Sequence, residues 1–132
     1  MRLICIGDSL TFGYGVHLSQ RWTQLCAQET GWELVNEGIN GDTTGGMLAR
    51  MQGGVLAELR EGGLGADRPY VLLMGGSNDV FYSGSDAAAR GNMGAMIHQL
   101  FSVGVLPMVG IPLPADAPHA VSYTHLTLPT IR

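Results

Sequence analysis

The sequence predicts an α/β sandwich of three layers, in which helices cover both faces of a parallel sheet. Along the 132 residues, short apolar runs alternate with stretches of helical periodicity, and neither an internal repeat nor a linker divides the chain. Strands that alternate with helices in this way pair in parallel through right-handed crossovers, which place helices on both faces of the sheet. A content of 45% hydrophobic and 14% charged residues is typical of a globular domain rather than a disordered chain.

The first strand and helix are predicted within residues 2–31. Arg2 to Ile6 is a short apolar run, and Gly7 ends it, as expected of a buried strand. Ser19 then fits the N-cap of a helix that stops at Gly31. The residues at helical spacing on the inward face of this helix are expected to be Trp22, Leu25 and Cys26.

The next two strands flank a second helix. Glu33 to Asn36 predicts a brief strand, and Pro69 to Met74, with the sequence PYVLLM, predicts a fully apolar one. The residues that an amphipathic helix between them is expected to turn inward are Leu48, Met51, Val55 and Leu59. Gly53 and Gly54 within this helix each cost up to about 1 kcal/mol relative to alanine, so the helix is expected to depend on packing against the sheet.

The last predicted helix precedes a fourth strand. Ser85 fits its N-cap, Gly104 ends it, and Val105 to Ile111 then forms a strand closed by the sequence PLP. The residues expected on the inward face of this helix are Met93, Ile97, Leu100 and Phe101.

The final segment departs from this pattern. Residues 121–132 show no helical period and no capping residue, where the fold would need another helix and strand. Val121 to Thr130 resembles the in-frame translation of a transposase-end sequencing adapter. We therefore expect an incomplete domain over residues 1–120, truncated after the fourth strand, and an adapter-derived tail over residues 121–132.

Charge and cysteine content exclude several classes of function. The chain has 7 arginines, no lysine and a net charge of −4, which excludes a Walker A phosphate loop, a Schiff-base enzyme and a lysine-rich nucleic-acid surface. Cys5 and Cys26 are too few for a disulfide framework, so free thiols are expected. No apolar run approaches the ~18 residues of a membrane span, and no signal peptide precedes the first strand, so a cytoplasmic location is expected.

Glycine is abundant where the predicted strands end. The 20 glycines of the chain are about twice the average content of ~7%. Those that follow the first three strands are Gly7, Gly13, Gly15, Gly38, Gly41, Gly75 and Gly76. Because ligands of open parallel sheets bind outside the carboxyl ends of the strands, we look for the functional site at this edge.

Three of these loops carry groups suited to nucleophilic catalysis. Ser9 follows the first strand, where its hydroxyl can project from the sheet edge, although the sequence around it is not the GxSxG nucleophile elbow. The loop of residues 36–44 is suited to present the backbone N–H of Gly41, and Asn78 adds a carboxamide after the third strand. A hydroxyl, a backbone N–H and a carboxamide are the parts of a nucleophile with an oxyanion hole.

These loops also carry a family resemblance. The sequences GDSL at residues 7–10, NGDTT at 40–44 and GSND at 76–79, in this order, resemble the first three sequence blocks of the SGNH (GDSL-type) esterase and lipase family. The resemblance covers nearly everything up to Pro114 and implies the flavodoxin-like SGNH fold.

By this resemblance, Ser9 is the nucleophile, and the Ser9 N–H, the Gly41 N–H and the Asn78 side chain form the oxyanion hole. The implied reaction is acyl transfer from a small-molecule ester or thioester to water through an acyl-Ser9 intermediate, with no metal and no cofactor. Asp8 and Asp79 are expected to hold the loops through hydrogen bonds. The oligomeric state stays open.

The catalytic base is the element that departs from the family pattern. The family places a late DxxH, whose histidine deprotonates the serine, after a further helix and strand. Here Asp116 and His119 spell DxxH directly after the fourth strand, so we interpret the match as a coincidence. Because His17, His98 and His125 offer no convincing base either, we expect a serine esterase fragment that lacks its catalytic Asp and His and is nearly inactive.

Two other functions are considered. A non-catalytic, flavodoxin-like ligand-binding module would use the loops after the first and third strands for a phosphate or a flavin. The absence of lysine and of GxGxxG opposes this alternative. A non-catalytic member of the same family is not distinguished from a truncated enzyme by these residues.

Overall fold

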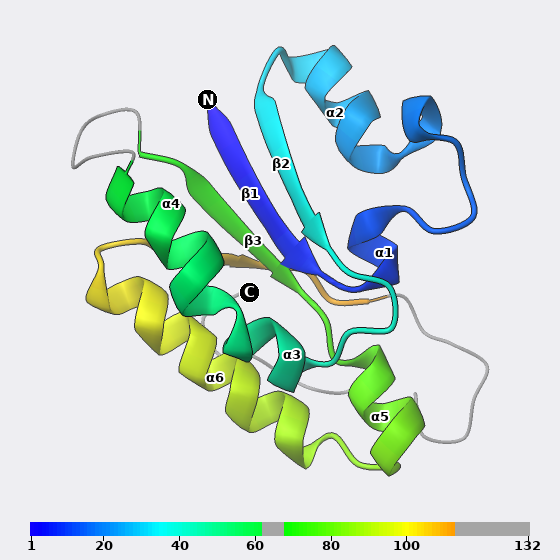
Figure 1. Ribbon diagram of the computed structural model, residues 1–132, viewed down its shortest axis with the longest axis vertical. Coiled ribbons are helices and arrows are strands. Elements are labelled where there is room, and N and C mark those ends of the chain that lie inside the picture. The colour runs from blue at the N-terminus through cyan, green and yellow to red at the C-terminus, as the bar shows by residue number, and fades with distance from the viewer. Residues whose placement is uncertain (62–67, 113–132) are drawn as a thin grey trace.

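The computed structural model of the chain describes residues 1–61 and 68–112 and contains one parallel sheet (Figure 1). Its strands lie in the order β2-β1-β3-β4. They are β1 (Arg2–Gly7), β2 (Glu33–Gly38), β3 (Tyr70–Met74) and β4 (Met108–Val109). β1 pairs with both neighbours, with Cys5 opposite Asn36 on β2 and Leu72 on β3. The predicted α/β class with a parallel sheet is confirmed.

Helices flank this sheet on both sides. They are α1 (Ser9–Phe12), the 3-10 helix η1 (Leu18–Gln20), α2 (Trp22–Thr30), α3 (Thr44–Ala49), the π-helical segment η2 (Met51–Val55), α4 (Leu56–Glu61), α5 (Ser77–Ser83) and α6 (Ala87–Ser102). Figure 1 shows α2 on one side of the sheet and α3, α4 and α6 on the other. Among the described residues, no helix is long and apolar enough to cross a membrane.

The main core lies between the sheet and the layer formed by α3, α4 and α6. Ile4, Ile6, Val71 and Leu73 point from β1 and β3 into this layer, where they belong to one buried cluster with residues of the helices. Helix residues of the cluster are Met47, Met51, Val55, Leu56, Leu59, Met93, Met96, Ile97 and Leu100. Met51, Val55 and Leu59 are therefore buried as predicted, and Leu48 packs partly buried against them.

The predicted second helix is interrupted rather than continuous. α3 ends at Ala49, and η2 follows with wider turns that include Gly53 and Gly54 before α4 begins. Two consecutive glycines weaken a helix, which agrees with an irregular segment at this point.

The interior face of α2 was predicted correctly only in part, since Trp22 and Cys26 are half-buried but Leu25 is not. Leu25 is 47% exposed, and the buried residue of this helix is Thr23. The reason lies in the strand below, because Asn36 of β2 donates its side-chain amide to the Thr23 hydroxyl at 3.1 Å and makes this contact polar. Ser19 does not cap α2 either; it lies within η1, and the helix begins after Arg21.

Other elements differ from prediction in length or packing. Phe101 is 44% exposed and does not join the buried face of α6, whereas Met93, Ile97 and Leu100 do. β2 extends to Gly38, and β4 comprises Met108–Val109 within the predicted range of residues 105–111. α5 was not predicted, because it is one short helix that begins in the loop after β3. The DxxH of residues 116–119 and the predicted tail of residues 121–132 lie outside the described residues.

Candidate active site

Ser9 is the first residue of the one-turn helix α1, directly after the end of β1. Asp8 caps this helix, since its Oδ1 accepts a hydrogen bond from the Leu10 N–H at 2.9 Å. The first N–H groups of a helix have no partner within it, and the Ser9 N–H bonds to none of the described residues. The half-buried Ser9 hydroxyl also has no hydrogen-bond partner in that part of the chain. Both groups are therefore available at the sheet edge.

α1 is held by contacts to β2 and α2. The Asn36 side-chain amide donates to the carbonyl oxygen of Thr11 at 2.8 Å, and Trp22 Nε1 donates to the carbonyl of Leu10 at 3.0 Å. Gly38 leaves the space that α1 occupies, because a Cβ at this position would lie 2.7 Å from the Cα of Phe12. These contacts fix the position of Ser9 relative to the end of β2.

Asp8 is an acidic group buried beside two others. Only 1% of its surface is exposed, and this burial raises the pKa of its carboxyl. Hydrogen bonds from the backbone N–H groups of Leu10 and Asp8 oppose the rise, and the carboxylates of Asp42 and Asp79 add to it. Acidic side chains of the loops after β1, β2 and β3 therefore lie close enough to influence one another. Among the described residues they form no cluster suited to hold a metal ion.

Gly41 occupies a turn after β2. The N–H of Asp42 donates to the carbonyl of Ile39 at 3.1 Å and closes the turn, in which Gly41 has a φ of +77°. This conformation favours glycine at the third position of a β-turn. The turn bond does not use the N–H of Gly41, which bonds to no other described residue. Within the described residues, the N–H of Gly41 is therefore not used by the turn.

Asn78 connects the loop after β3 to the loop after β2. Its Nδ2 donates to the backbone carbonyl of Asp42 at 2.8 Å. A carboxamide nitrogen carries two hydrogens, so the second one is available for another acceptor. Asn78 is the second residue of α5, which begins after Gly76. The bond to Asp42 places the carboxamide next to the turn that contains Gly41.

Asp79 also connects the loop after β2 with the loop after β3. Its carboxylate accepts hydrogen bonds from the Thr44 N–H at 2.8 Å and from the Thr44 hydroxyl at 2.7 Å. Asn92 of α6 in turn donates to the Thr44 hydroxyl at 3.1 Å. Asp79 and Thr44 are both buried. The structural roles expected for Asp8 and Asp79 are therefore confirmed.

Arg50 is the residue at this edge that the sequence interpretation missed. Its guanidinium donates to the carbonyl of Gly7 at 2.8 Å, to the carbonyl of Glu37 at 2.6 Å and to the carboxylate of Asp42 at 3.0 Å. The available signal was that Arg50 is the one charged residue between Asp42 and Glu58 in the sequence. A single cation in an otherwise uncharged helical segment indicates a specific partner.

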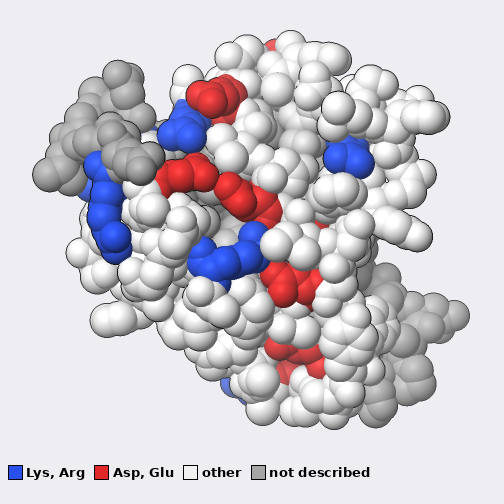
Figure 2. Space-filling model, in the orientation of Figure 1, with Lys and Arg blue, Asp and Glu red and all other residues white. Residues whose placement is uncertain are grey.

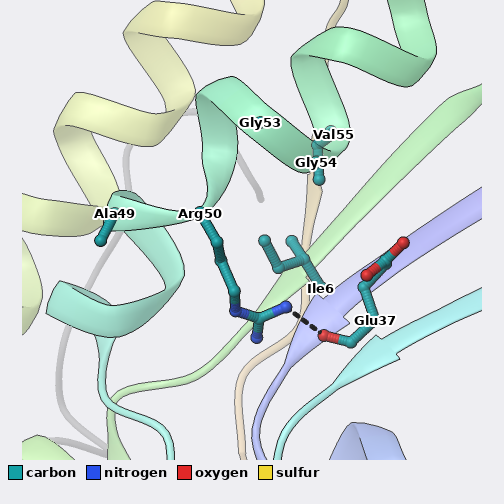
Figure 3. A pocket seen from close by; sticks show the side chains of 7 residues that line it. All are labelled: Ile6, Glu37, Ala49, Arg50, Gly53, Gly54 and Val55. Atoms are coloured by element: carbon teal, nitrogen blue, oxygen red, sulfur yellow. Dashed lines mark hydrogen bonds between the residues drawn. The ribbon is translucent and has the colours of Figure 1, made fainter.

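A cavity adjoins Arg50 on the helix side of the sheet (Figure 3). It has a volume of about 320 Å³ and is lined by Ile6, Glu37, Ala49, Arg50, Gly53, Gly54 and Val55. Ser9, Gly41 and Asn78 do not line it. Figure 2 shows acidic and basic side chains gathered in a band on one face of the molecule. Ion pairs among the described residues include Arg50 with Asp42 and Arg2 with Glu58.

The described histidines do not form a base for Ser9. His17 is exposed in the segment before η1, and His98 is exposed on α6, as expected of a surface residue. Neither makes a hydrogen bond to another described residue. Asp116, His119 and His125 lie outside the described residues.

The chain is similar in sequence to known proteins. The model of the GDSL-like lipase/acylhydrolase family matches residues 5–128. Esterase TesA of Pseudomonas aeruginosa is 29% identical over 121 residues, which are 86% of this chain and 56% of that protein. The chain therefore spans about half the length of this curated relative.

Solved structures give the same result. A protein assigned to the lipolytic G-D-S-L family from Desulfitobacterium hafniense is 26% identical, with a TM-score of 0.76 over 93% of this chain and 64% of its own. The crystal structure of TesA is 27% identical, with a TM-score of 0.75 over 94% of this chain and 68% of its own. The similarity thus covers nearly all of this chain and about two thirds of these structures.

Proposed function

The chain belongs to the GDSL-like lipase/acylhydrolase family, and we propose that it carries the nucleophile and the oxyanion hole of a serine esterase or thioesterase. The observation that carries this proposal is the hydrogen bond from Asn78 Nδ2 to the Asp42 carbonyl. It joins the two loops that bear the Gly41 N–H and the carboxamide, and it leaves one carboxamide hydrogen for a substrate. Ser9 begins α1, which follows β1, and β1 lies between β2 and β3 in the sheet.

The proposed reaction begins when Ser9 Oγ attacks the carbonyl carbon of an ester or thioester. The carbonyl oxygen becomes an oxyanion, which accepts hydrogen bonds from the N–H groups of Ser9 and Gly41 and from Asn78 Nδ2. Collapse of this intermediate expels an alcohol or thiol and leaves an acyl-Ser9 ester. Water then attacks the ester, releases the carboxylic acid and restores the serine.

The proton of the Ser9 hydroxyl requires a base. In the described residues, both histidines are exposed and lie without hydrogen bonds. We propose that the chain as given lacks the catalytic Asp and His, and that the whole protein supplies them. Serine hydrolases that lack triad members still accelerate hydrolysis by about 10³- to 10⁴-fold over water, because substrate binding and the oxyanion hole remain. Slow hydrolysis of a reactive ester is therefore expected of the chain.

The test compares p-nitrophenyl acetate hydrolysis by the chain and by Asn78→Ala. Loss of one oxyanion donor typically costs about 10²- to 10³-fold in a complete enzyme, so at least a tenfold loss of the slow rate is expected here. Ser102→Ala, which alters an exposed serine at the end of α6, is the matched control and should keep the rate. Equal rates for the chain and Asn78→Ala would show that no oxyanion hole operates.

A fluorophosphonate tests the nucleophile separately. Slow labelling that mass spectrometry locates at Ser9, and that Ser9→Ala abolishes, is expected. Labelling elsewhere would exclude Ser9 as the nucleophile. Rapid, stoichiometric labelling of Ser9 would show instead that the chain contains an activating base, which would contradict the proposed lack of Asp and His.

The non-catalytic, flavodoxin-like binding module is the less favoured function. Membership of an acylhydrolase family supports hydrolysis rather than flavin binding. A titration of the chain with FMN is expected to show no binding. The choice between ester and thioester substrates requires a panel of acyl groups, and the cytoplasmic location stays a prediction from the sequence.

A further inference from the structure

We propose that Arg50 is a positioning residue that sets the spacing of the three loops of the acyl-transfer site. This inference rests on the proposed function. Arg50 touches none of the groups assigned to the reaction, yet it bonds to the backbone at the ends of β1 and β2 and to the loop that follows β2. The carbonyl of Gly7, its partner on β1, lies two residues before Ser9.

The bonds of Arg50 lock two neighbouring strand ends together. Nη1 donates to the Glu37 carbonyl at 2.6 Å (Figure 3). Nη2 donates to the Gly7 carbonyl at 2.8 Å. These strand ends lead into the loops of Ser9 and Gly41. A guanidinium holds its donors in a rigid plane, so the two carbonyl oxygens are kept at a set separation. A flexible ammonium cannot impose the same geometry.

A second branch of contacts reaches Asn78 through Asp42. Arg50 Nε donates to Asp42 Oδ2 at 3.0 Å, and Nη2 lies 2.9 Å from the same oxygen. The carbonyl of Asp42 accepts the bond from Asn78 Nδ2. Asp42 also follows Gly41 directly in the chain. A shift of Asp42 would therefore move both the Gly41 N–H and the carboxamide of Asn78.

Burial strengthens this branch. The side chains of Arg50 and Asp42 are 22% and 13% exposed, so water competes little for their ion pair. Charge-assisted bonds of this kind are shorter and stronger than bonds between neutral groups. The loop after β2 is thus tied to the strand ends through the shortest and least exposed of the described ion pairs.

The cavity beside Arg50 makes the proposal testable by chemical rescue. Arg50 forms part of the cavity wall, and a Cβ added at Gly53 or Gly54 would meet no atom within 4 Å. Arg50→Ala would extend this open space to the carbonyls of Gly7 and Glu37. Ethylguanidinium could then enter and replace the missing group.

The experiment uses the 132-residue chain, its Arg50→Ala and Arg50→Lys variants, and Arg60→Ala as control. Arg60 is an exposed arginine of α4 whose guanidinium bonds to Gln52. The first readout is the NMR signals of the Asn78 side-chain amide and the Gly41 N–H. The second is the slow, Asn78-dependent hydrolysis of p-nitrophenyl acetate.

Arg50→Ala is expected to shift both NMR signals and to lower the hydrolysis rate at least tenfold. Millimolar ethylguanidinium should reverse both effects in Arg50→Ala. Arg50→Lys should show the same signal shifts and loss of rate, because an ammonium cannot impose the guanidinium geometry, and Arg60→Ala should show neither effect. Unchanged signals and rate in Arg50→Ala would overturn the proposal, as would a folded Arg50→Ala that ethylguanidinium does not restore.

A second variant covers the case in which Arg50→Ala does not fold. Asp42→Asn keeps the backbone carbonyl but removes the charge that faces Arg50, so it should shift the Asn78 amide signal in the same direction as Arg50→Lys. An unchanged signal in Asp42→Asn would overturn the proposal. If hydrolysis by the chain does not depend on Asn78, the proposed function fails, whereas the NMR signals still decide whether Arg50 positions the loops.

Discussion

Replacement of Gly38 by alanine is expected to displace α1, and with it Ser9. Gly38 has no positive φ, so its backbone tolerates a side chain, and only space matters. The new Cβ would lie 2.7 Å from the Cα of Phe12, 2.9 Å from the carbonyl oxygen of Asp8 and closer still to the Phe12 nitrogen. All three are backbone atoms of α1 or its cap, which no rotamer change can move away.

The size of the effect follows from this geometry. Ordinary van der Waals contact begins at 3.4 Å, so α1 must retreat by about 0.7 Å at the Cα of Phe12. Overpacking typically costs about 1–3 kcal/mol, and contacts with backbone place Gly38→Ala in the upper half of that range. A loss of roughly 2–3 kcal/mol lowers Tm by roughly 6–15 °C in a domain of this size. A displacement approaching 1 Å also lowers ester hydrolysis by on the order of 10-fold or more.

Thermal unfolding followed by circular dichroism measures the loss, with Gly91→Ala as the matched control. Gly91 lies in α6, and a Cβ there would meet no atom within 4 Å. Alanine in a helix is favoured over glycine by about 0.5–1 kcal/mol, so this variant should gain stability. The two variants add the same methyl group with opposite expected signs. A Tm of Gly38→Ala equal to or above that of the unmodified chain would refute the reasoning.

Three further predictions concern buried polar and thiol groups. Burial raises the pKa of Asp8 above its ordinary 3.8, so the protonated carboxyl contributes to stability at low pH, and this contribution is lost as pH rises through the folded pKa. Asp8→Asn keeps an oxygen to cap α1 and cannot ionise, so the amount by which its Tm exceeds that of the unmodified chain should grow from pH 3.5 to 7. A Tm difference that stays constant over this range would contradict the prediction. Burial raises the pKa of Cys5 to about 12, so a disulfide reagent at pH 8 should titrate one thiol, Cys26, in the native chain and two after unfolding; two fast native thiols would be inconsistent with the fold. Asp79→Ala leaves the N–H and the hydroxyl of Thr44 buried without this acceptor and should cost about 2–5 kcal/mol in denaturant unfolding, whereas an unchanged midpoint would show that the network contributes nothing.

Local patterns in the sequence predicted most of the secondary structure. The apolar run PYVLLM forms β3, and Gly31 ends α2 with a φ of +73°, because both features depend on neighbouring residues alone. The periodicity of Met93, Ile97 and Leu100 also located the buried face of α6. These predictions needed no knowledge of what each element packs against.

Predictions that depended on packing partners were less accurate. Leu25 was expected to be inside, but α2 meets the sheet at Asn36, so the polar Thr23 lies there instead. Phe101 has the helical spacing of a core residue, yet it remains 44% exposed because the burial of a position depends on what covers it. Periodicity defines a face of a helix, whereas the fold decides how wide the covered part of that face is.

The three loops of the candidate site show the same division. Motifs that are local in sequence were sufficient to place Ser9, Gly41 and Asn78 after three strands of one sheet, because parallel strands end at a common edge. Arg50 could not be recognised in this way. Its carbonyl partner at Gly7 lies 43 positions away in the chain, and only the crossover from β2 over β1 to β3 brings the two together. Hydrogen bonds between such distant residues are decided by tertiary structure, since no local pattern specifies which strand end a helix will pass.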